Sequence, residues 1–515
     1  MRRLPWFSRQ WHFATLVVAG LCQAWSISWP FEFGPATGQP VWWFQILALA
    51  WLYRQLQAAS TSRHAFQMAW VFATTWLAAT FWWLFTAMHT YGGMPFALAA
   101  LAVMLLASVL ALYYGAAAAM AHGLRSEGSP TTRVSVFAAT WLLAELCRGV
   151  LWTGFGWGAI GYAHVDGPLH MLAPLGGAYA MAFVSAWLSA ALAESGWGSQ
   201  WRMVAAALVA SASFVPGLHS KWTAPVAAST VSLLQGNIAQ DEKFMAGTGI
   251  PQALTWYADQ LQHSQADIVI APETAIPLLP AQLEPEYWNA LEQHFAKGPS
   301  LGIIGIPLGS FEAGYTNSVL GLQPGREAPW RYDKHHLVPF GEFIPTGFRW
   351  FTRMMQIPLG DFARGPVAPP PIVWKGQRIA INICYEDLFG EELGARFIDP
   401  VQEPTIFANV SNIAWFGKSA AVDQHLHISR MRALEFERPF VRATNTGATV
   451  IINHQAQVQA ALPYQTTGVL EGSVQGRTGV TPYAWWVSRW GLAPLWLFCA
   501  AVLLLAYGAR RCLAG

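Results

Sequence analysis

The chain has 515 residues, of which 54% are hydrophobic and 11% are charged, and its formal net charge at pH 7 is +2. Soluble domains carry about 25% charged residues, so this composition excludes a wholly soluble protein, and the small net charge gives no support to nucleic-acid binding. Charged residues are sparse up to about residue 220, dense from about 230 to 475, and sparse again to the end. This distribution predicts a membrane domain, a soluble domain and a closing anchor.

Apolar stretches long enough to cross about 30 Å of hydrocarbon are expected to form membrane spans. They cover residues 11–29, 41–57, 66–89, 95–121, 134–152, 172–194, 203–218 and 490–508. The first follows the segment MRRLPW, and the spans behind it favour an uncleaved signal-anchor over a signal peptide. We therefore expect about seven transmembrane helices in a membrane domain at 1–220, an exported domain at 225–480, and a transmembrane helix with a short cytoplasmic tail at 487–515.

The basic residues of the short connecting segments predict the orientation of these spans. Alternate segments carry all of the arginines: Arg2, Arg3, Arg9, Arg54, Arg63, Arg125, Arg133, Arg202, Arg510 and Arg511. With eight spans these segments all lie on one side of the membrane, which the positive-inside rule makes the cytoplasmic side. The soluble domain between the last two spans is then expected on the outer face.

The distribution of cysteines agrees with this orientation. Four of the five fall in predicted spans or in the cytoplasmic tail: Cys22, Cys147, Cys499 and Cys512. Cys384 is the only one in the exported domain, where an unpaired thiol is a liability unless it is used. The sequence lacks the Cys/His spacings of zinc sites, so we expect no metal. His425 and His427 fall on different faces of a predicted helix, which favours a structural role.

The exported domain alternates β-rich runs with amphipathic stretches. Strands are predicted at 230–238, 266–274, 300–307, 317–323, 378–384, 405–411 and 441–453. Helices are predicted at 250–264, 285–297 and 420–437. Several strands are almost continuous apolar runs, which is typical of a sheet covered on both faces. The expected fold class is therefore a layered α/β domain attached to a polytopic α-helical membrane domain.

Three reactive side chains follow strands of this domain. Glu273 follows one buried strand, Lys334 lies in the segment RYDKHHLVPFGEFIP, and Cys384 ends the strand RIAINIC. Each alone has a plain structural interpretation, but sites of α/β domains collect at strand ends. The carboxylates that follow Cys384 would raise its pKa and weaken it as a nucleophile, unless a nearby cation reverses the field.

These segments resemble a known enzyme family. APET, YDKHHLVPFGE and NICYED carry Glu, Lys and Cys in the order of the catalytic triad of the nitrilase superfamily of carbon–nitrogen hydrolases. Together with the spans, PFGEFIP, LLQGNIAQDEKF and AELCRGVLWTGFGWGAIGY, they resemble the apolipoprotein N-acyltransferases, the branch of that superfamily fused to membrane spans. That family usually has Trp where this chain has Phe244, a departure that concerns an acyl or headgroup contact.

The resemblance implies a fold and a role for each site residue. The exported domain would be an αββα sandwich, with Glu273 as general base, Lys334 as cation and Cys384 as nucleophile. Lys334 and the backbone N–H of Tyr385 would stabilise the oxyanion. The carboxylates expected to hold the lysine are Glu342 and Glu386. The side chains expected to contact lipid are Phe244, Trp350 and Phe351, although the segment 348–360 has core packing as an equal alternative.

The resemblance also implies a reaction. An acyl chain would pass from a phospholipid, through a cysteine thioester, to the α-amino group of the N-terminal diacylglyceryl-cysteine of an apolipoprotein. This ping-pong reaction needs no cofactor and would take place on the periplasmic face of a bacterial inner membrane. Two alternatives remain: a membrane-tethered amidase or nitrilase that gives the acyl group to water, and a transporter or sensor with an exported binding domain.

Overall fold

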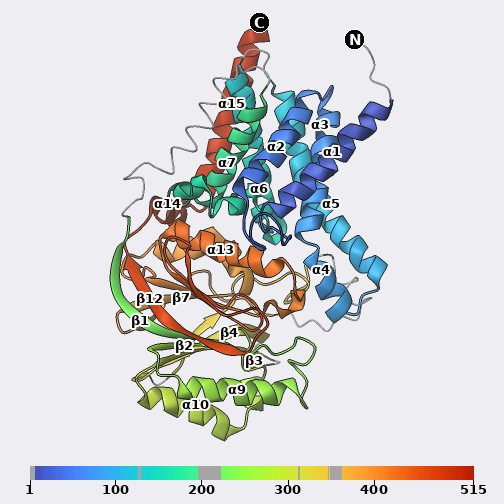
Figure 1. Ribbon diagram of the computed structural model, residues 1–515. Helices are drawn as coiled ribbons and strands as arrows, with labels where there is room; N and C mark the ends of the chain where they lie inside the picture. Colours follow the sequence, from blue (N-terminus) through green and yellow to red (C-terminus); the bar gives the residue numbers. More distant parts are fainter. Residues whose placement is uncertain are drawn as a thin grey trace. The chain divides into compact units, whose positions relative to one another are not determined.

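The computed structural model describes residues 6–125, 129–194, 222–310, 312, 314–326, 328–345, 347 and 362–514 (Figure 1). The chain divides into two compact units. The helical unit comprises Met1–Phe85, Pro95–Ser220 and Trp490–Gly515. The sheet unit comprises Thr86–Met94 and Lys221–Arg489. The short segment Thr86–Met94 was expected inside or beside a membrane span, but its contacts place it with the sheet unit.

The helical unit contains these α-helices: α1 (Trp6–Trp25), α2 (Trp42–Gln57), α3 (Ser62–Thr80), α4 (Trp83–Thr86), α5 (Phe96–Gly123), α6 (Pro130–Val150), α7 (Ala173–Ala193) and α15 (Ala493–Ala514). Four helical stretches in the described part of the chain have the length and hydropathy to cross a membrane: Phe96–Gly123, Pro130–Thr153, Pro168–Ala193 and Ala493–Arg511. They coincide with four of the expected spans.

The other expected spans differ from simple helices. The one expected at 66–89 is broken, because Ser62–Thr80 and Trp83–Tyr91 meet at a bend of 52°. The first two expected spans correspond to the shorter apolar helix His12–Trp25 and to α2, which has 16 residues. The span expected at 203–218 lies outside the described residues.

Two charged side chains lie inside the helical unit on α6. Glu145 accepts a hydrogen bond from the backbone N–H of Ile160 at 3.0 Å. Arg148 donates to the hydroxyl of Tyr114 at 2.9 Å and to two backbone carbonyls of the loop that follows α6. Each buried charge therefore has polar partners of its own, which offset part of the loss of water, while Glu145 Oε2 and Arg148 Nη2 have none in the described part of the chain.

The sheet unit contains two six-stranded sheets. The first has the order β12-β1-β2-β3-β4-β5, with β1 (Ala224–Gln235), β2 (Ile268–Ile270), β3 (Leu301–Ser310), β4 (Gly314–Leu322), β5 (Trp330–Asp333) and β12 (Gly468–Thr478). The second has the order β11-β10-β9-β8-β7-β6, with β6 (Ile372–Trp374), β7 (Gln377–Ile383), β8 (Ile406–Ser411), β9 (Phe440–Thr444), β10 (Val450–Ile452) and β11 (Val458–Ala461).

The central strands of each sheet are parallel and their side chains are apolar on both faces. β2 pairs in parallel with β1 and β3, and β8 pairs in parallel with β7 and β9. Residues such as Leu233, Ile270 and Ile383 form the core between the two sheets. Parallel strands buried on both faces need such residues throughout, which explains the continuous apolar runs of the sequence.

Helices cover the outer face of each sheet, so the sheet unit has an αββα arrangement (Figure 1). α9 (Gly249–His263) and α10 (Pro285–Lys297) pack on the first sheet through a second core that includes Tyr257 and Phe295. α13 (Ala421–Phe436) packs on the second sheet, where Phe436 contacts Phe407 with ring centroids 5.4 Å apart. The expected strand at 441–453 is two strands, β9 and β10, which pair with each other.

Candidate active site

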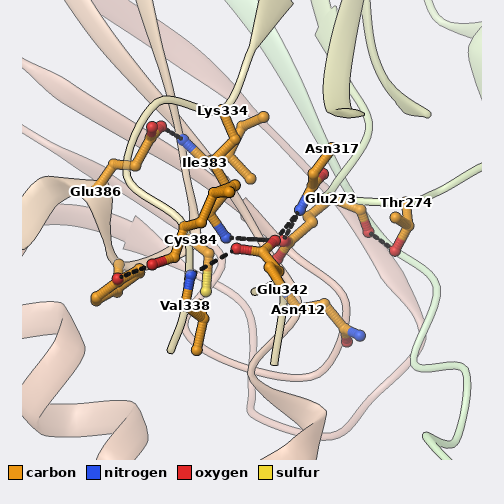
Figure 2. A network of polar contacts seen from close by, with 12 residues as sticks. Glu273, Thr274, Asn317, Lys334, Val338, Glu342, Ile383, Cys384, Glu386 and Asn412 are labelled. Atoms are coloured by element: carbon orange, nitrogen blue, oxygen red, sulfur yellow. Dashed lines mark hydrogen bonds and ion pairs between the residues drawn. The ribbon is translucent and has the colours of Figure 1, made fainter. Parts of the chain in front are cut away.

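The three reactive side chains singled out above all follow strands, and the two sheets share them (Figure 2). Glu273 follows β2 and Lys334 directly follows β5, so both come from the first sheet. Cys384 directly follows β7 of the second sheet and begins the short 3-10 helix η6 (Cys384–Leu388). Its φ of +54° lies in the left-handed region, which costs a non-glycine residue about 1–2 kcal/mol. Such strain collects at functional sites, where the surrounding fold holds it.

Glu273 is buried and both of its carboxylate oxygens accept hydrogen bonds. Oε1 accepts from the Nδ2 of Asn317 on β4 at 2.7 Å, and Oε2 accepts from the backbone N–H of Asn412 at 2.7 Å. The Nζ of Lys334 lies 3.6 Å from Oε1. These donors keep the carboxylate in one orientation.

Lys334 is a buried cation held between two carboxylates. Its Nζ lies 2.9 Å from the Oε1 of Glu342 and 3.6 Å from that of Glu273. Glu342 is itself oriented by Asn317 Nδ2 at 2.7 Å and by the backbone N–H of Val338 at 2.8 Å. Burial lowers the pKa of Lys334, but the two carboxylates outweigh burial and hold that pKa well above its ordinary value. Lys334 therefore stays charged at any physiological pH.

The Cys384 thiol sits among these charges and is protonated at rest. Burial, and after it the negative charge of Glu273, raise the pKa of this thiol to about 12, although Lys334 acts in the opposite direction. The cation thus reduces the effect of the acidic surroundings but does not reverse it. A reaction at the sulfur consequently needs a base that removes the proton as the bond forms, and the carboxylate of Glu273 lies in the same cluster.

Tyr385 contributes both its main chain and its ring. It is the second residue of η6, and the first N–H groups of a helix have no partner within that helix. Its hydroxyl donates to the backbone carbonyl of Leu337 at 2.6 Å, and the Nζ of Lys334 lies 5.7 Å from its ring centroid. The ring therefore joins η6 to the loop that carries the lysine.

The carboxylate of Glu386 supports the same loop by binding backbone N–H groups. Four donors bond its carboxylate at 2.6 to 3.0 Å: the N–H groups of Ile383, His335 and His336 and the hydroxyl of Tyr332. It was expected, with Glu342, to help hold Lys334 in place. In the structure Glu386 binds the two N–H groups that follow the lysine in the chain, so it orients the cation indirectly.

A second buried charge network lies beside Cys384. Asp387 of η6 accepts from the Nε2 of His425 at 2.9 Å and from Arg442 at 3.1 Å, and it is also bonded to the hydroxyl of Ser429. Arg442 also lies 3.0 Å from the Nδ1 of His425, so this nitrogen is the acceptor and the imidazole is neutral. These contacts place His425 in a structural network, as its position on the predicted helix indicated.

Of the three residues expected to contact lipid, the structure describes one. Phe244 lies in a turn of the sheet unit with 54% of its surface exposed. Trp350 and Phe351 lie outside the described residues. No group of three His, Cys, Asp or Glu that could hold a metal ion occurs in the described ranges.

Three further residues bond Glu273 that were not predicted from the sequence. Asn317 and Asn412 orient its carboxylate, and the Nζ of Lys243 donates to its backbone carbonyl at 3.0 Å. A polar asparagine within the apolar run NSVLGLQ was the available signal for Asn317. Lys243 follows two acidic residues in the segment QDEK and has the sequence context of a solvated turn.

Comparisons with known proteins give the same division of the chain. Residues 19–191 match the family described as apolipoprotein N-acyltransferase N-terminal domain, and residues 230–483 match the carbon-nitrogen hydrolase family. The chain is 52% identical to an apolipoprotein N-acyltransferase of Verminephrobacter eiseniae, with 94% of each chain covered. It is 44% identical to that of Ralstonia nicotianae, with 92% of this chain and 90% of the relative covered.

Among solved structures, a carbon-nitrogen hydrolase from Helicobacter pylori is similar to half of this chain. The identity is 15% and the TM-score is 0.35, with 52% of this chain and 94% of that chain covered. The two matched families account for the two parts of the molecule, a polytopic α-helical membrane domain and a nitrilase-like αββα domain. Because the identity to the curated relatives extends over nearly the whole length, the chain belongs to the apolipoprotein N-acyltransferase family.

Proposed function

We propose that this chain transfers a fatty acyl group from a phospholipid to the α-amino group of the N-terminal diacylglyceryl-cysteine of an apolipoprotein, through a thioester on Cys384. The observation that carries the proposal is the convergence of Glu273, Lys334 and Cys384 at one edge of the two sheets. Membership of the acyltransferase family supports transfer to an amine over transfer to water.

The first half-reaction forms the thioester. The Sγ of Cys384 attacks the carbonyl carbon of the phospholipid ester while Glu273 takes the thiol proton. The negative charge moves to the carbonyl oxygen, where the ammonium of Lys334 and the N–H of Tyr385 are the proposed donors. Collapse of this intermediate breaks the ester C–O bond, and the proton on Glu273 passes to the leaving oxygen of the lysophospholipid.

The second half-reaction empties the same site. The neutral amine of the acceptor attacks the thioester carbonyl, and Glu273 takes a proton from the nitrogen. The C–S bond breaks, the amide is released, and the proton returns to the sulfur. The two lipid substrates use the site in turn, which gives ping-pong kinetics. Water must stay out between the two steps, because hydrolysis of the thioester would waste the acyl group.

The proposed location follows from the substrates and from the arginine pattern. The catalytic domain would lie on the periplasmic side of the inner membrane, since every basic connecting segment is expected on the opposite side. Lipid would reach the site past apolar side chains, for which Phe244, Trp350 and Phe351 are the candidates. An apolar side chain at the headgroup boundary gains from burial in the lipid.

The thioester provides the direct test. Purified enzyme incubated with phospholipid vesicles and no acceptor should accumulate an acyl group that neutral hydroxylamine releases. Adding a diacylglyceryl lipopeptide should discharge it as an amide. Cys384→Ala should form no adduct, because the exported domain has no other cysteine.

Two results would contradict the proposal. An adduct of normal yield on the Cys384→Ala protein would exclude this nucleophile. Release of free fatty acid at the same rate with and without the lipopeptide would identify a hydrolase instead of a transferase.

A further inference from the structure

A second buried lysine lies directly behind the proposed base. The side chain of Lys243 is only 2% exposed, and its Nζ donates to the backbone carbonyl of Glu273 at 3.0 Å. The same carbonyl accepts from the hydroxyl of Thr274 at 2.8 Å. Thr274 has a φ of +48°, so the chain turns sharply at this point and the two donors stabilise an unfavourable conformation.

The segment that carries Lys243 is anchored on both of its sides. The N–H of Lys243 bonds the carbonyl of Ala239 at 2.9 Å, which closes a helical turn. Three residues earlier, the Oε1 of Gln240 accepts from the Nδ2 of Asn412 at 2.8 Å. The backbone N–H of Asn412 bonds the Oε2 of Glu273. The segment 240–243 therefore contacts Glu273 in two ways. Lys243 binds its main-chain carbonyl directly, and Gln240 binds Asn412, which in turn binds its carboxylate.

Lys243 also adds a buried positive charge to the site. Glu273 and Glu342 both lie near Lys334, and Glu386 is a third buried carboxylate beside the lysine loop. Lys243 is thus a second cation in a cluster rich in carboxylates, where a buried negative charge without a counter-charge is costly.

We propose that Lys243 is a positioning residue for the base, fixing the main chain of Glu273 and supplying a second buried positive charge beside Cys384. This inference rests on the proposed function, because it assigns Lys243 a role in forming the thioester. The negative charge that moves from Glu273 to the oxyanion then remains in a cluster that holds two buried cations, Lys334 and Lys243.

The protonation of Lys243 makes this role measurable. Burial lowers its pKa to about 8, against the opposing effect of Glu273 and Cys384, which are the ionisable groups that act on it. The other charged groups of its own turn are the exposed carboxylates of Asp241 and Glu242. Lys243 should lose its charge as the pH rises through about 8, and acylation of Cys384 should slow over the same interval.

The experiment compares wild type with Lys243→Met and Lys243→Arg in the full-length enzyme. The readout is the single-turnover rate of Cys384 acylation from phospholipid vesicles between pH 6 and 10, with thermal unfolding measured in parallel. Lys243→Met should lower this rate at pH 7 about 100-fold, the size of effect that a small misplacement of a catalytic group produces. Lys243→Arg should keep most of the rate, and its alkaline decline should move above pH 9, because arginine stays charged. Lys375→Met, at an exposed ion pair with Asp267, is the matched control and should behave as wild type.

Two outcomes would overturn this inference and leave the proposed function unaffected. One is a folded Lys243→Met enzyme that acylates Cys384 at the wild-type rate. The other is an alkaline decline in Lys243→Arg that coincides with that of wild type, and this comparison decides the matter even if the methionine variant does not fold. A wild-type enzyme that forms no thioester would instead refute the proposed function, and the inference with it.

Discussion

Two buried charge networks flank Cys384, and they are built differently. In the first, Glu273, Lys334 and Glu342 surround the thiol, and the carboxylates act strongly on its pKa. In the second, Asp387 and His425 bond each other and share Arg442, so each charged group faces a partner within the network. The side chains of Asp387, His425 and Arg442 are at most 1% exposed, whereas Glu273 and Glu342 are 9% and 12% exposed. Both networks contain a carboxylate close in the chain to a strand end.

Burial and charge alone therefore do not distinguish the groups of the proposed active site from those of a structural network. A buried network whose members satisfy one another stabilises a loop, as Asp387 does for the helix η6 that begins at Cys384. In the first network a carboxylate and an ammonium lie beside a protonated thiol. These groups are therefore placed to act on a substrate. Removing one member of each network should therefore have opposite consequences for activity and stability.

The largest effect is expected for Glu273→Gln. The amide preserves the shape of the side chain but does not accept the thiol proton, so acylation of Cys384 should fall by about 10²–10⁴-fold. The rate of acyl-enzyme formation from phospholipid, measured in a single turnover, checks this prediction. Thermal unfolding should change far less than this rate.

The reactivity of the thiol provides a control for the same variant. Removing the negative charge of Glu273 lowers the pKa of the thiol, because that charge is among the causes that raise it. Alkylation of Cys384 by iodoacetamide at pH 8 should consequently be faster in Glu273→Gln than in wild type, while acylation is slower. A parallel change in both rates would mean that the carboxylate does not act as the base.

Asp387→Asn should affect stability before activity. Leaving Arg442 without its carboxylate inside the fold should lower the free energy of unfolding by about 3–5 kcal/mol. Acylation per folded molecule should stay within a few-fold of wild type. Thermal or denaturant unfolding, with active-site titration of the folded fraction, separates the two quantities.

The pH dependence sharpens the prediction for Asp387. Burial raises the pKa of this carboxyl, but His425 and Arg442 outweigh it, and the net shift is downward. A lowered folded-state pKa stabilises the protein above the unfolded value, about 3.9. The difference in stability between wild type and Asp387→Asn should therefore shrink as the pH falls below about 4. A difference that is constant from pH 3 to 7 would contradict the ionised state of Asp387.

The smallest effect is expected at the exposed residue Phe244. Phe244→Ser should raise the apparent KM for phospholipid in vesicles by roughly tenfold, since it removes about 1.5 kcal/mol of apolar contact. Stability should change by less than about 0.5 kcal/mol, as for other surface substitutions. Val401→Ser, at another exposed apolar side chain of the sheet unit, is the control. Equal effects of the two substitutions on KM would show that Phe244 has no special contact with lipid.

The helices and strands that have a clear local hydrophobic pattern were predictable from the sequence. The helices α9, α10 and α13 and the central strands β3, β7 and β8 lie where periodicity and apolar runs placed them. The peripheral strands β5, β6, β11 and β12 were missed. Edge and antiparallel strands such as β11 and β12 have mixed or exposed faces, so they lack the continuous apolar signal of the buried ones.

The reactive groups of the candidate site were predictable from the sequence, but the residues that hold them in position were not. Glu273 and Cys384 stand out because each follows an apolar strand, a pattern that neighbouring residues create. Lys334 stands out through the segment YDKHHLVPFGE, which resembles that of the family. Asn317 and Lys243 reach Glu273 only through the pairing of β4 within its sheet and the return of a distant turn. Their contacts depend on the order of the strands, which no local pattern encodes.

Local patterning was sufficient for the membrane and soluble parts of the chain and for the layered α/β class, because hydrophobic periodicity is a property of neighbouring residues. It also marked Glu273 and Cys384 as strand-end residues, while Lys334 was singled out with the family resemblance. The sharing of the site between two sheets, the raised pKa of Cys384 and the second buried lysine at Glu273 depend on the folded arrangement. Each of these features arises from desolvation and from charges on segments far apart in the chain, and those distances exist only once the two sheets have packed face to face.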